Sequence, residues 1–189
     1  MPLVLASGSP RRAELLEAAG FAFRVQPADV DESVLAQEDP RPYALRVASA
    51  KADRVAEHCR ESGTVVLAAD TVVVVADRIL GKPGTEAEAF SMLKALSGVV
   101  HEVHTGVVVR AGPVRLCDVV TTRVHLLPLT DSEIAWYIGT GEPWGKAGGY
   151  AIQGRAARFV DWIEGSWSNV VGLPISTVHR LLTAVAERD

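Results

Sequence analysis

Residues 3–12, LVLASGSPRR, place a short apolar run, a loop of small residues and a proline near the start of the chain. The run from Leu3 to Ala6 is typical of a buried strand. Pro10 suits the first position of a helix, because its missing N–H would have no partner there. We therefore predict a strand, a tight loop over 7–9 and a helix that ends at the common helix cap Gly20. This order is the start of an alternating α/β fold.

The apolar patterns along the rest of the chain continue this alternation and then change to a hairpin. We predict strands over 21–25, 64–75 (one long strand or two) and 159–163, two strands flanking a turn at 111–113 within 99–126, and helices over 43–61, 85–96, 130–138 and 174–187. Such an order predicts an α/β fold with a mixed, mainly twisted central sheet flanked by helices. The 189 residues, 48% of them hydrophobic, fit one domain spanning 1–189.

Composition excludes several classes of protein. The sequence has no run of about 18 apolar residues that could span a bilayer, so we expect a soluble, cytoplasmic protein with no membrane partner. The net charge of −4 gives no broad basic field for nucleic acid. Cys59 and Cys117 lie far apart and outside any CxxC pattern, which disfavours a disulfide framework or a zinc site.

The loop and first helical turn over 7–12 form the first candidate site. Small residues after a strand expose backbone N–H groups and hydroxyls, among them Ser7, at a helix N-terminus, where a phosphate is a natural ligand. Arg11 and Arg12 oppose the helix dipole unless they face an anion; the alternative is that they are ordinary surface residues. The sequence contains neither a GxxxxGK[ST] nor a GxGxxG motif, which disfavours ATP-motor and dinucleotide folds.

Asp70 and Thr71 interrupt the valine-rich run 65–75. A carboxylate inside an apolar strand is costly unless it is paired, hydrogen-bonded or bound to a metal. The pair is therefore a candidate for an active site, and the alternative is a turn at a sheet edge.

Four further polar residues are weaker candidates when each is taken alone. Lys82, in a Gly-Lys-Pro-Gly loop, could reach a phosphate, whereas Lys51 could also belong to a solvated helix face. Glu32 could hold a divalent cation or belong to an ordinary acidic loop. Gln153, in the run GGYAIQG at 148–154, could read a base edge, or the run could be a plain glycine-rich turn.

Eight motifs occur together along almost the whole chain. They are LASGSPRRAELL (5–16), VDE (30–32), ASAKA (48–52), AADTVV (68–73), LGKP (80–83), LSG (96–98), KAGGYAIQG (146–154) and NVVGLP (169–174). In order and spacing this series resembles the Maf family of nucleotide pyrophosphatases, a group of house-cleaning enzymes in nucleotide metabolism. The resemblance implies a Maf/ITPase-like fold with two lobes around a cleft, and a homodimer.

The resemblance also implies a hydrolase that cleaves between the α and β phosphates of a nucleoside triphosphate. Asp70 matches the family's proton acceptor, and a divalent cation, Mg²⁺ or Mn²⁺, is required. We expect Asp70 to orient or deprotonate the attacking water and, together with Glu32, to be a candidate metal ligand.

The phosphate contacts are expected from basic groups and a hydroxyl. Arg12, Lys51 and Lys82 are expected to hold the phosphates, and Ser7 is expected to donate to the same chain.

Three positions resemble the dTTP and UTP branch of the family: Arg11, Thr71 and Gln153. An amide can both accept from N3–H and donate to a carbonyl of thymine or uracil, which a carboxylate cannot do. Two positions depart from the family pattern, since Gly145 replaces a common aspartate and Trp167 a common tyrosine.

Other functions stay open at this point. The protein could prefer modified or methylated nucleotides such as 7-methyl-GTP, or it could be a nucleotide-sensing regulator of septum formation with negligible turnover. A nucleic-acid-binding module is suggested only by local arginines, including Arg155 and Arg158, and the acidic total argues against it.

Overall fold

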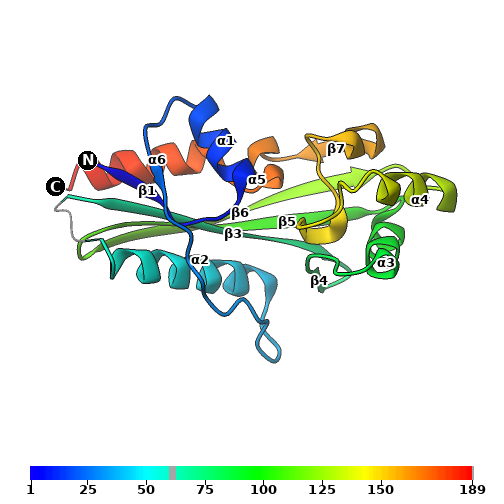
Figure 1. The fold of residues 1–189 in the computed structure, drawn as a ribbon, viewed down its shortest axis with the longest axis horizontal. Coiled ribbons are helices and arrows are strands. Elements are labelled where there is room, and N and C mark those ends of the chain that lie inside the picture. Colours follow the sequence, from blue (N-terminus) through cyan, green and yellow to red (C-terminus); the bar gives the residue numbers. More distant parts are fainter. Residues whose placement is uncertain (60–62, 189) are drawn as a thin grey trace. The chain divides into compact units, whose positions relative to one another are not determined.

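The computed structural model describes residues 1–59 and 63–188. In chain order its elements are β1 (Leu3–Leu5), α1 (Pro10–Ala18), β2 (Arg24–Val25), α2 (Pro40–Ala56), β3 (Val65–Val75), β4 (Arg78–Leu80), α3 (Glu86–Leu96), β5 (Val100–Ala111), β6 (Val114–Leu126), α4 (Asp131–Gly139), the 3-10 helices η1 (Ala147–Gly149) and η2 (Arg155–Phe159), β7 (Val160–Glu164), α5 (Trp167–Val171) and α6 (Ile175–Ala186) (Figure 1). None of the helices in this described part is long and apolar enough to cross a membrane.

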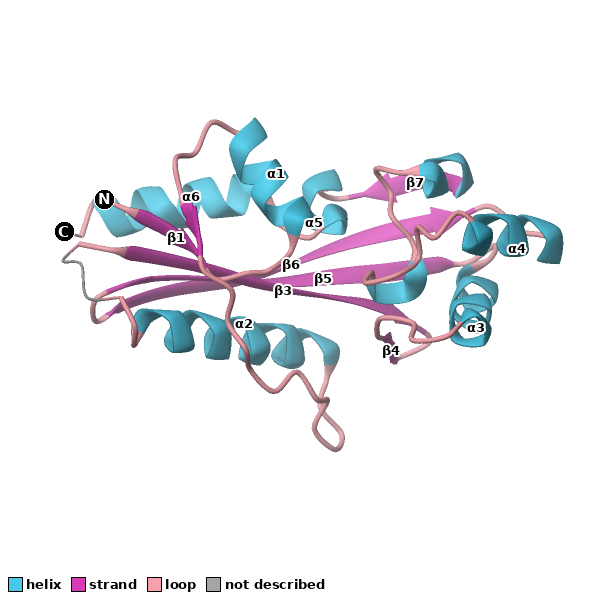
Figure 2. Cartoon of the chain, viewed as in Figure 1, coloured by secondary structure: helices cyan, strands magenta, loops and turns pink. Residues whose placement is uncertain are grey.

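The strands form a mixed sheet, as predicted, and the sheet has seven strands. The strand order is β2-β1-β3-β5-β6-β7, and β4 pairs with β3 outside this path. Strand β1 pairs in parallel with both β2 and β3, whereas β4 and β7 are antiparallel to β3 and β6. The hairpin of β5 and β6, with 12 and 13 residues, contains the longest strands (Figure 2).

The chain divides into two compact units. The first comprises 1–71, 105–120 and 172–189, and the second comprises 72–104 and 121–171. Strands β3, β5 and β6 each contribute residues to both units.

In the first unit both faces of the strands are buried. Leu3, Leu67 and Val107 belong to a cluster that includes residues of α1 and α6, whereas Val4 and Val108 belong to another that includes residues of α2. Figure 1 shows α2 on one face of β1 and β3, and α1 with α6 on the opposite face. Successive residues of a strand point to opposite faces, so a fully apolar strand requires helices on both sides.

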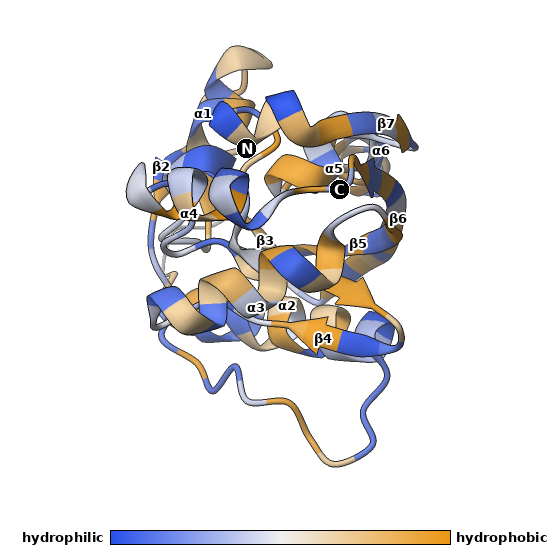
Figure 3. Ribbon diagram, turned by 90° about the vertical axis from the view of Figure 1, so that its right-hand side faces the viewer, coloured by the Kyte–Doolittle hydropathy of each residue, from blue (hydrophilic) through white to orange (hydrophobic). Residues whose placement is uncertain are grey.

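In the second unit the predicted helix caps are present. Thr85 accepts a hydrogen bond from the Glu88 N–H at the start of α3, and Thr130 forms a complete capping box with Glu133 at the start of α4. The two helices contact each other, and their ribbons in Figure 3 carry both hydrophobic and hydrophilic residues. This mixture suits helices that pack through one face.

Several predicted boundaries were wrong. Of 21–25, only Arg24 and Val25 pair with β1, because Phe21 and Phe23 pack against the core of the first unit instead of extending the ladder. Helix α2 begins at Pro40, three residues early, since a proline is tolerated in the first turn. It ends at Ala56, and residues 60 and 61 of its predicted end lie outside the described residues.

Other differences concern short elements. Pro174 precedes α6 as its N-cap residue. The five-residue helix α5 and the short strand β4 were not predicted. β4 follows a turn at Ala76 and Asp77, whose φ angles of 46° and 59° suit the tight connection of a hairpin.

Gly106 on β5 allows the backbone of α2 to approach closely. A Cβ at this position would lie 2.5 Å from the carbonyl oxygen of Ala44. We expect Gly106→Ala to lower the free energy of unfolding by about 1–3 kcal/mol, because rigid backbone must move to relieve the overlap. Thermal denaturation measures this, with Gly139→Ala as the control, since nothing lies within 4 Å of a Cβ there. Equal melting temperatures for both variants would contradict the expectation.

Candidate active site

A hydrogen bond between Ser7 and Arg12 connects the loop that follows β1 to helix α1. Ser7 is buried, and its Oγ accepts hydrogen bonds from the Ser9 N–H at 3.2 Å and from Arg12 Nη1 at 3.1 Å. Pro10 begins the helix, as predicted. The Arg12 side chain therefore points back to the loop and does not extend into solvent.

Arg12 is buried and its guanidinium donates to three neutral oxygens. Besides Ser7 Oγ, these are the Gly172 carbonyl oxygen, 2.8 Å from Nε, and Thr71 Oγ1, 3.1 Å from Nη2. Burial lowers the pKa of Arg12, and the negative charge of Asp70 opposes this shift. Within the described residues no carboxylate forms an ion pair with this guanidinium. A buried cation held only by neutral acceptors favours an anionic ligand.

Thr71 links three segments that are distant in the sequence. Its Oγ1 lies 2.9 Å from Thr105 Oγ1 on β5 and 3.3 Å from the Gly172 carbonyl oxygen. Gly172 has a φ of 130°, which an L-residue with a side chain rarely adopts. Neither Thr105 nor Gly172 was among the residues predicted for the site. The signal for Thr105 was similar to that for Thr71, a threonine close to a run of valines, although Gly106 separates Thr105 from Val107.

Lys51 is bonded to two carboxylates. Its Nζ lies 2.7 Å from Asp70 Oδ1 and 2.5 Å from Glu32 Oε1. Lys51 is 6% exposed and Asp70 7% exposed. The alternative of a solvated helix face for Lys51 was therefore wrong. The edge turn proposed for Asp70 was also wrong, because β3 lies between β1 and β5.

The acidic loop that carries Glu32 is held against α2. The Tyr43 hydroxyl donates to the Glu32 carbonyl oxygen at 2.6 Å, and Arg46 donates to both the Ser33 carbonyl oxygen and the Glu38 carboxylate. Burial, together with the negative charges of Asp70 and Glu32, raises the pKa of Tyr43 to about 12. Helix α2 thus positions Glu32 as well as Lys51.

Glu32 and Asp70 suit a hard divalent cation. Both carboxylates contact one ammonium nitrogen, so a positive charge already lies between them. Among residues 1–59 and 63–188 there is no group of three or more His, Cys, Asp or Glu side chains that could hold a metal. A cation bound here would have Glu32 and Asp70 as carboxylate ligands, and further oxygens, such as those of a bound phosphate, would complete its coordination, which is how Mg²⁺ is usually bound.

Comparison with known proteins identifies the family of this chain. The family model described as Maf-like protein matches residues 2–185. The chain belongs to the Maf family. The match includes both carboxylates, Lys51 and Arg12, so the cluster described above lies within a Maf-like domain.

Two curated relatives match over most of their length. A "dTTP/UTP pyrophosphatase" of Anaeromyxobacter dehalogenans is 54% identical over 95% of this chain and 92% of that protein. A protein of the same name from Koribacter versatilis is 50% identical over 96% of this chain and 93% of that protein. The solved Ham1 protein of Staphylococcus aureus is 14% identical, with a TM-score of 0.44, over 67% of this chain and 72% of that protein.

The remaining residues predicted for the Maf site have different environments. Arg11, on α1, is half-buried, and burial lowers its pKa while Glu14 opposes the shift. Lys82 and Gln153 are exposed and belong to the second unit. Gly145, where the Maf pattern commonly has aspartate, has a φ of 72°.

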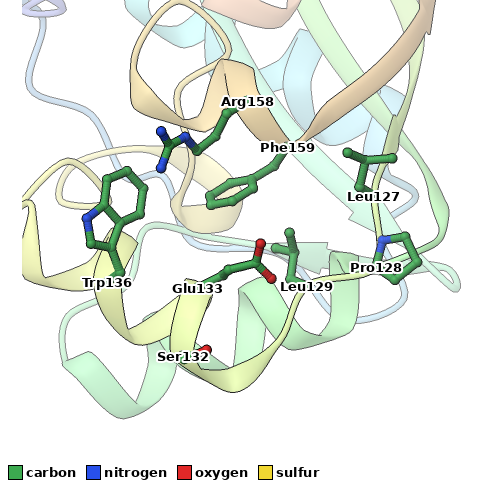
Figure 4. Close-up of a pocket in the computed structure, with 8 residues that line it drawn as sticks. All are labelled: Leu127, Pro128, Leu129, Ser132, Glu133, Trp136, Arg158 and Phe159. Carbon is green, nitrogen blue, oxygen red and sulfur yellow. The ribbon is translucent and has the colours of Figure 1, made fainter.

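A pocket of about 400 Å³ lies within the second unit, between α4 and the end of η2 (Figure 4). The ring of Phe159 lies at its centre in the view, with Leu129, Glu133 and Trp136 around it. Arg158 stacks on Trp136, with its Cζ 4.4 Å from the ring centroid. None of the residues predicted for the Maf site lines this pocket.

Proposed function

We propose that this protein hydrolyses dTTP and UTP to the monophosphate and pyrophosphate. The name of the curated relatives supports this activity. The observation that carries the proposal is the buried guanidinium of Arg12, which donates only to neutral oxygens and is linked through Thr71 to the strand of Asp70. Such an arrangement suits a phosphate chain beside a carboxylate.

Hydrolysis at the α phosphorus requires an oriented water and neutralisation of the phosphate charge. Asp70 orients the water or removes its proton, in the role of a general base. Arg12 and Lys82 bind phosphate oxygens, and Ser7 adds a hydroxyl donor. Lys51 holds the Asp70 carboxylate in place and adds a positive charge close to the phosphates.

Glu32 and Asp70 would hold the divalent cation, Mg²⁺ or Mn²⁺, that the family requires. The cation, when bound, neutralises phosphate charge and stabilises the leaving pyrophosphate. Chelation of metal is expected to stop turnover and added Mg²⁺ or Mn²⁺ to restore it.

The reaction products test the proposed activity. The protein is incubated with dTTP, UTP, CTP, GTP and 7-methyl-GTP, each with Mg²⁺ or Mn²⁺, and the products are separated. Monophosphate plus pyrophosphate, formed fastest from dTTP and UTP, supports the proposal. Diphosphate plus orthophosphate overturns it, and a preference for 7-methyl-GTP overturns the choice of base. Tight nucleotide binding without turnover favours the regulator of septum formation instead.

Gln153, together with Arg11 and Thr71, is proposed to set the preference for thymine and uracil. We expect Gln153→Glu to lower kcat/KM for dTTP and UTP by about 10- to 100-fold, because a carboxylate cannot donate to the base carbonyl. CTP hydrolysis should change much less. Gln37→Glu, at an exposed loop residue, is the matched control. An unchanged ratio of dTTP to CTP hydrolysis would contradict this assignment.

The proposal includes a cytoplasmic homodimer without nucleic-acid or membrane partners. The net charge of −4 agrees with the absence of a nucleic-acid partner. Analytical ultracentrifugation measures the oligomeric state, and a monomer at micromolar concentration would contradict the dimer.

A further inference from the structure

Glu142 binds the loop that carries Gln153. From the turn after α4, its Oε2 accepts from the Arg155 N–H at 3.0 Å and its Oε1 from the Ala156 N–H at 3.3 Å. The Tyr137 hydroxyl donates to the same Oε1 at 2.7 Å. A carboxylate that accepts several hydrogen bonds from backbone N–H groups fixes the course of the chain around it.

Tyr137 extends this contact to the other side of Gln153. Its hydroxyl oxygen accepts from the Ala151 N–H at 3.1 Å while its hydrogen goes to Glu142. Gln153 therefore lies between two backbone anchors, Ala151 before it and Arg155 after it. Both contacts depend on the Glu142 carboxylate, which binds the Arg155 N–H directly and the Ala151 N–H through the Tyr137 hydroxyl.

Gly154 allows the Glu142 carboxylate to approach the backbone closely. A Cβ at Gly154 would lie 2.4 Å from Glu142 Oε2, a distance that no relaxed structure tolerates. A side chain at position 154 would therefore displace the Glu142 carboxylate from its hydrogen bonds with Tyr137, Arg155 and Ala156. This explains part of the GYAIQG pattern, which the sequence alone left as a ligand-binding run or a plain turn.

Aromatic residues also hold the backbone on both sides of Gln153, Tyr150 before it and Phe159 after it. The Tyr150 hydroxyl lies 2.8 Å from His101 Nε2 in a buried contact, and burial lowers the pKa of His101 to about 4. At the other end, Phe159 packs edge-on against Tyr137 and Trp136. The backbone on either side of Gln153 is therefore fixed, while the Gln153 side chain itself is exposed.

We propose that Glu142 is a positioning residue for base recognition, acting through the backbone of 151–156 on Gln153. The inference rests on the proposed function, because it assigns to Glu142 the placement of the amide that reads the base. A loop held in one conformation presents its amide without an ordering cost when the nucleotide binds.

The hydrogen bonds of Glu142 assign its carboxylate a structural role in this loop. Both of its carboxylate oxygens already accept hydrogen bonds from within the loop and from Tyr137. Burial raises the pKa of Glu142, but the hydrogen bonds from Arg155, Tyr137 and Ala156 outweigh burial and the net shift is downward. The folded protein therefore stabilises the ionised, hydrogen-bonded form of Glu142.

The test measures the discrimination between bases. Glu142→Gln keeps the size of the side chain but places an NH₂ group against N–H donors. We expect it to reduce the ratio of kcat/KM for dTTP to that for CTP by about tenfold or more, mainly through a loss for dTTP. Tyr137→Phe, which removes only the hydroxyl, should shift the ratio in the same direction by less. Glu187→Gln, at an exposed position after α6, is the matched control.

A double-mutant cycle with Gln153→Ala separates positioning from general stability. If Glu142 acts through Gln153, the double variant discriminates no worse than Gln153→Ala alone. Equal losses for dTTP and CTP in both Glu142→Gln and Tyr137→Phe, or fully additive effects in the cycle, would overturn the inference. Wild-type protein that fails to hydrolyse any triphosphate would instead overturn the proposed function.

Discussion

Replacing Asp70 with asparagine is expected to reduce the hydrolysis of dTTP by about 100- to 10,000-fold, the contribution typical of a general base. An amide has the size of the carboxylate but cannot take a proton from water. Lys51 keeps Glu32 as an ionic partner in this variant, so the loss of stability is expected to stay below the roughly 3–5 kcal/mol seen when a buried charge loses its only partner.

The measurement compares steady-state rates and thermal denaturation of the same preparations. Asp77→Asn, in the exposed turn between β3 and β4, makes the same chemical change away from the cluster. We expect this control to retain wild-type activity. A variant at Asp70 with a rate within tenfold of wild type, at saturating Mg²⁺ or Mn²⁺, would show that another group activates the water.

Arg12→Ala is expected to lower kcat/KM for dTTP by about 100- to 1,000-fold, the range for losing a preorganised donor to developing negative charge. The cost in stability should be smaller, about 1–3 kcal/mol. Burial of the guanidinium is itself unfavourable, and its acceptors keep other partners, because Ser7 Oγ still accepts from the Ser9 N–H and Thr71 Oγ1 still lies beside Thr105.

Arg12→Lys separates charge from geometry. A lysine keeps the positive charge but cannot donate to Ser7, Thr71 and Gly172 at once, so we expect an intermediate loss of activity. Pyrophosphate should raise the melting temperature of the wild type and fail to raise that of Arg12→Ala, because a ligand stabilises only a protein that binds it. Arg188→Ala is the exposed control. Equal stabilisation of wild type and Arg12→Ala would exclude Arg12 from the phosphate site.

Local features of the fold could be predicted from the sequence because they depend on neighbouring residues. The strand, loop and helix at the start of the chain, the cap at Thr85 and the capping box at Thr130 are of this kind. The long strand after residue 64 was visible as a valine-rich run, although its sequence could not show whether it was one strand or two. The strand predicted over 21–25 was too long, because alternating apolar residues such as Phe21 and Phe23 pack against a core whether or not they join a sheet.

The sequence by itself determined the alternating α/β pattern and, through the motif series, the family, and it predicted a phosphate site at the first loop. Only the tertiary structure decided that Lys51 lies between Glu32 and Asp70, and that Arg12 reaches a carbonyl 160 residues away. The physical reason is that periodicity reports which residues face a core, whereas strand order and helix packing decide which buried polar groups meet.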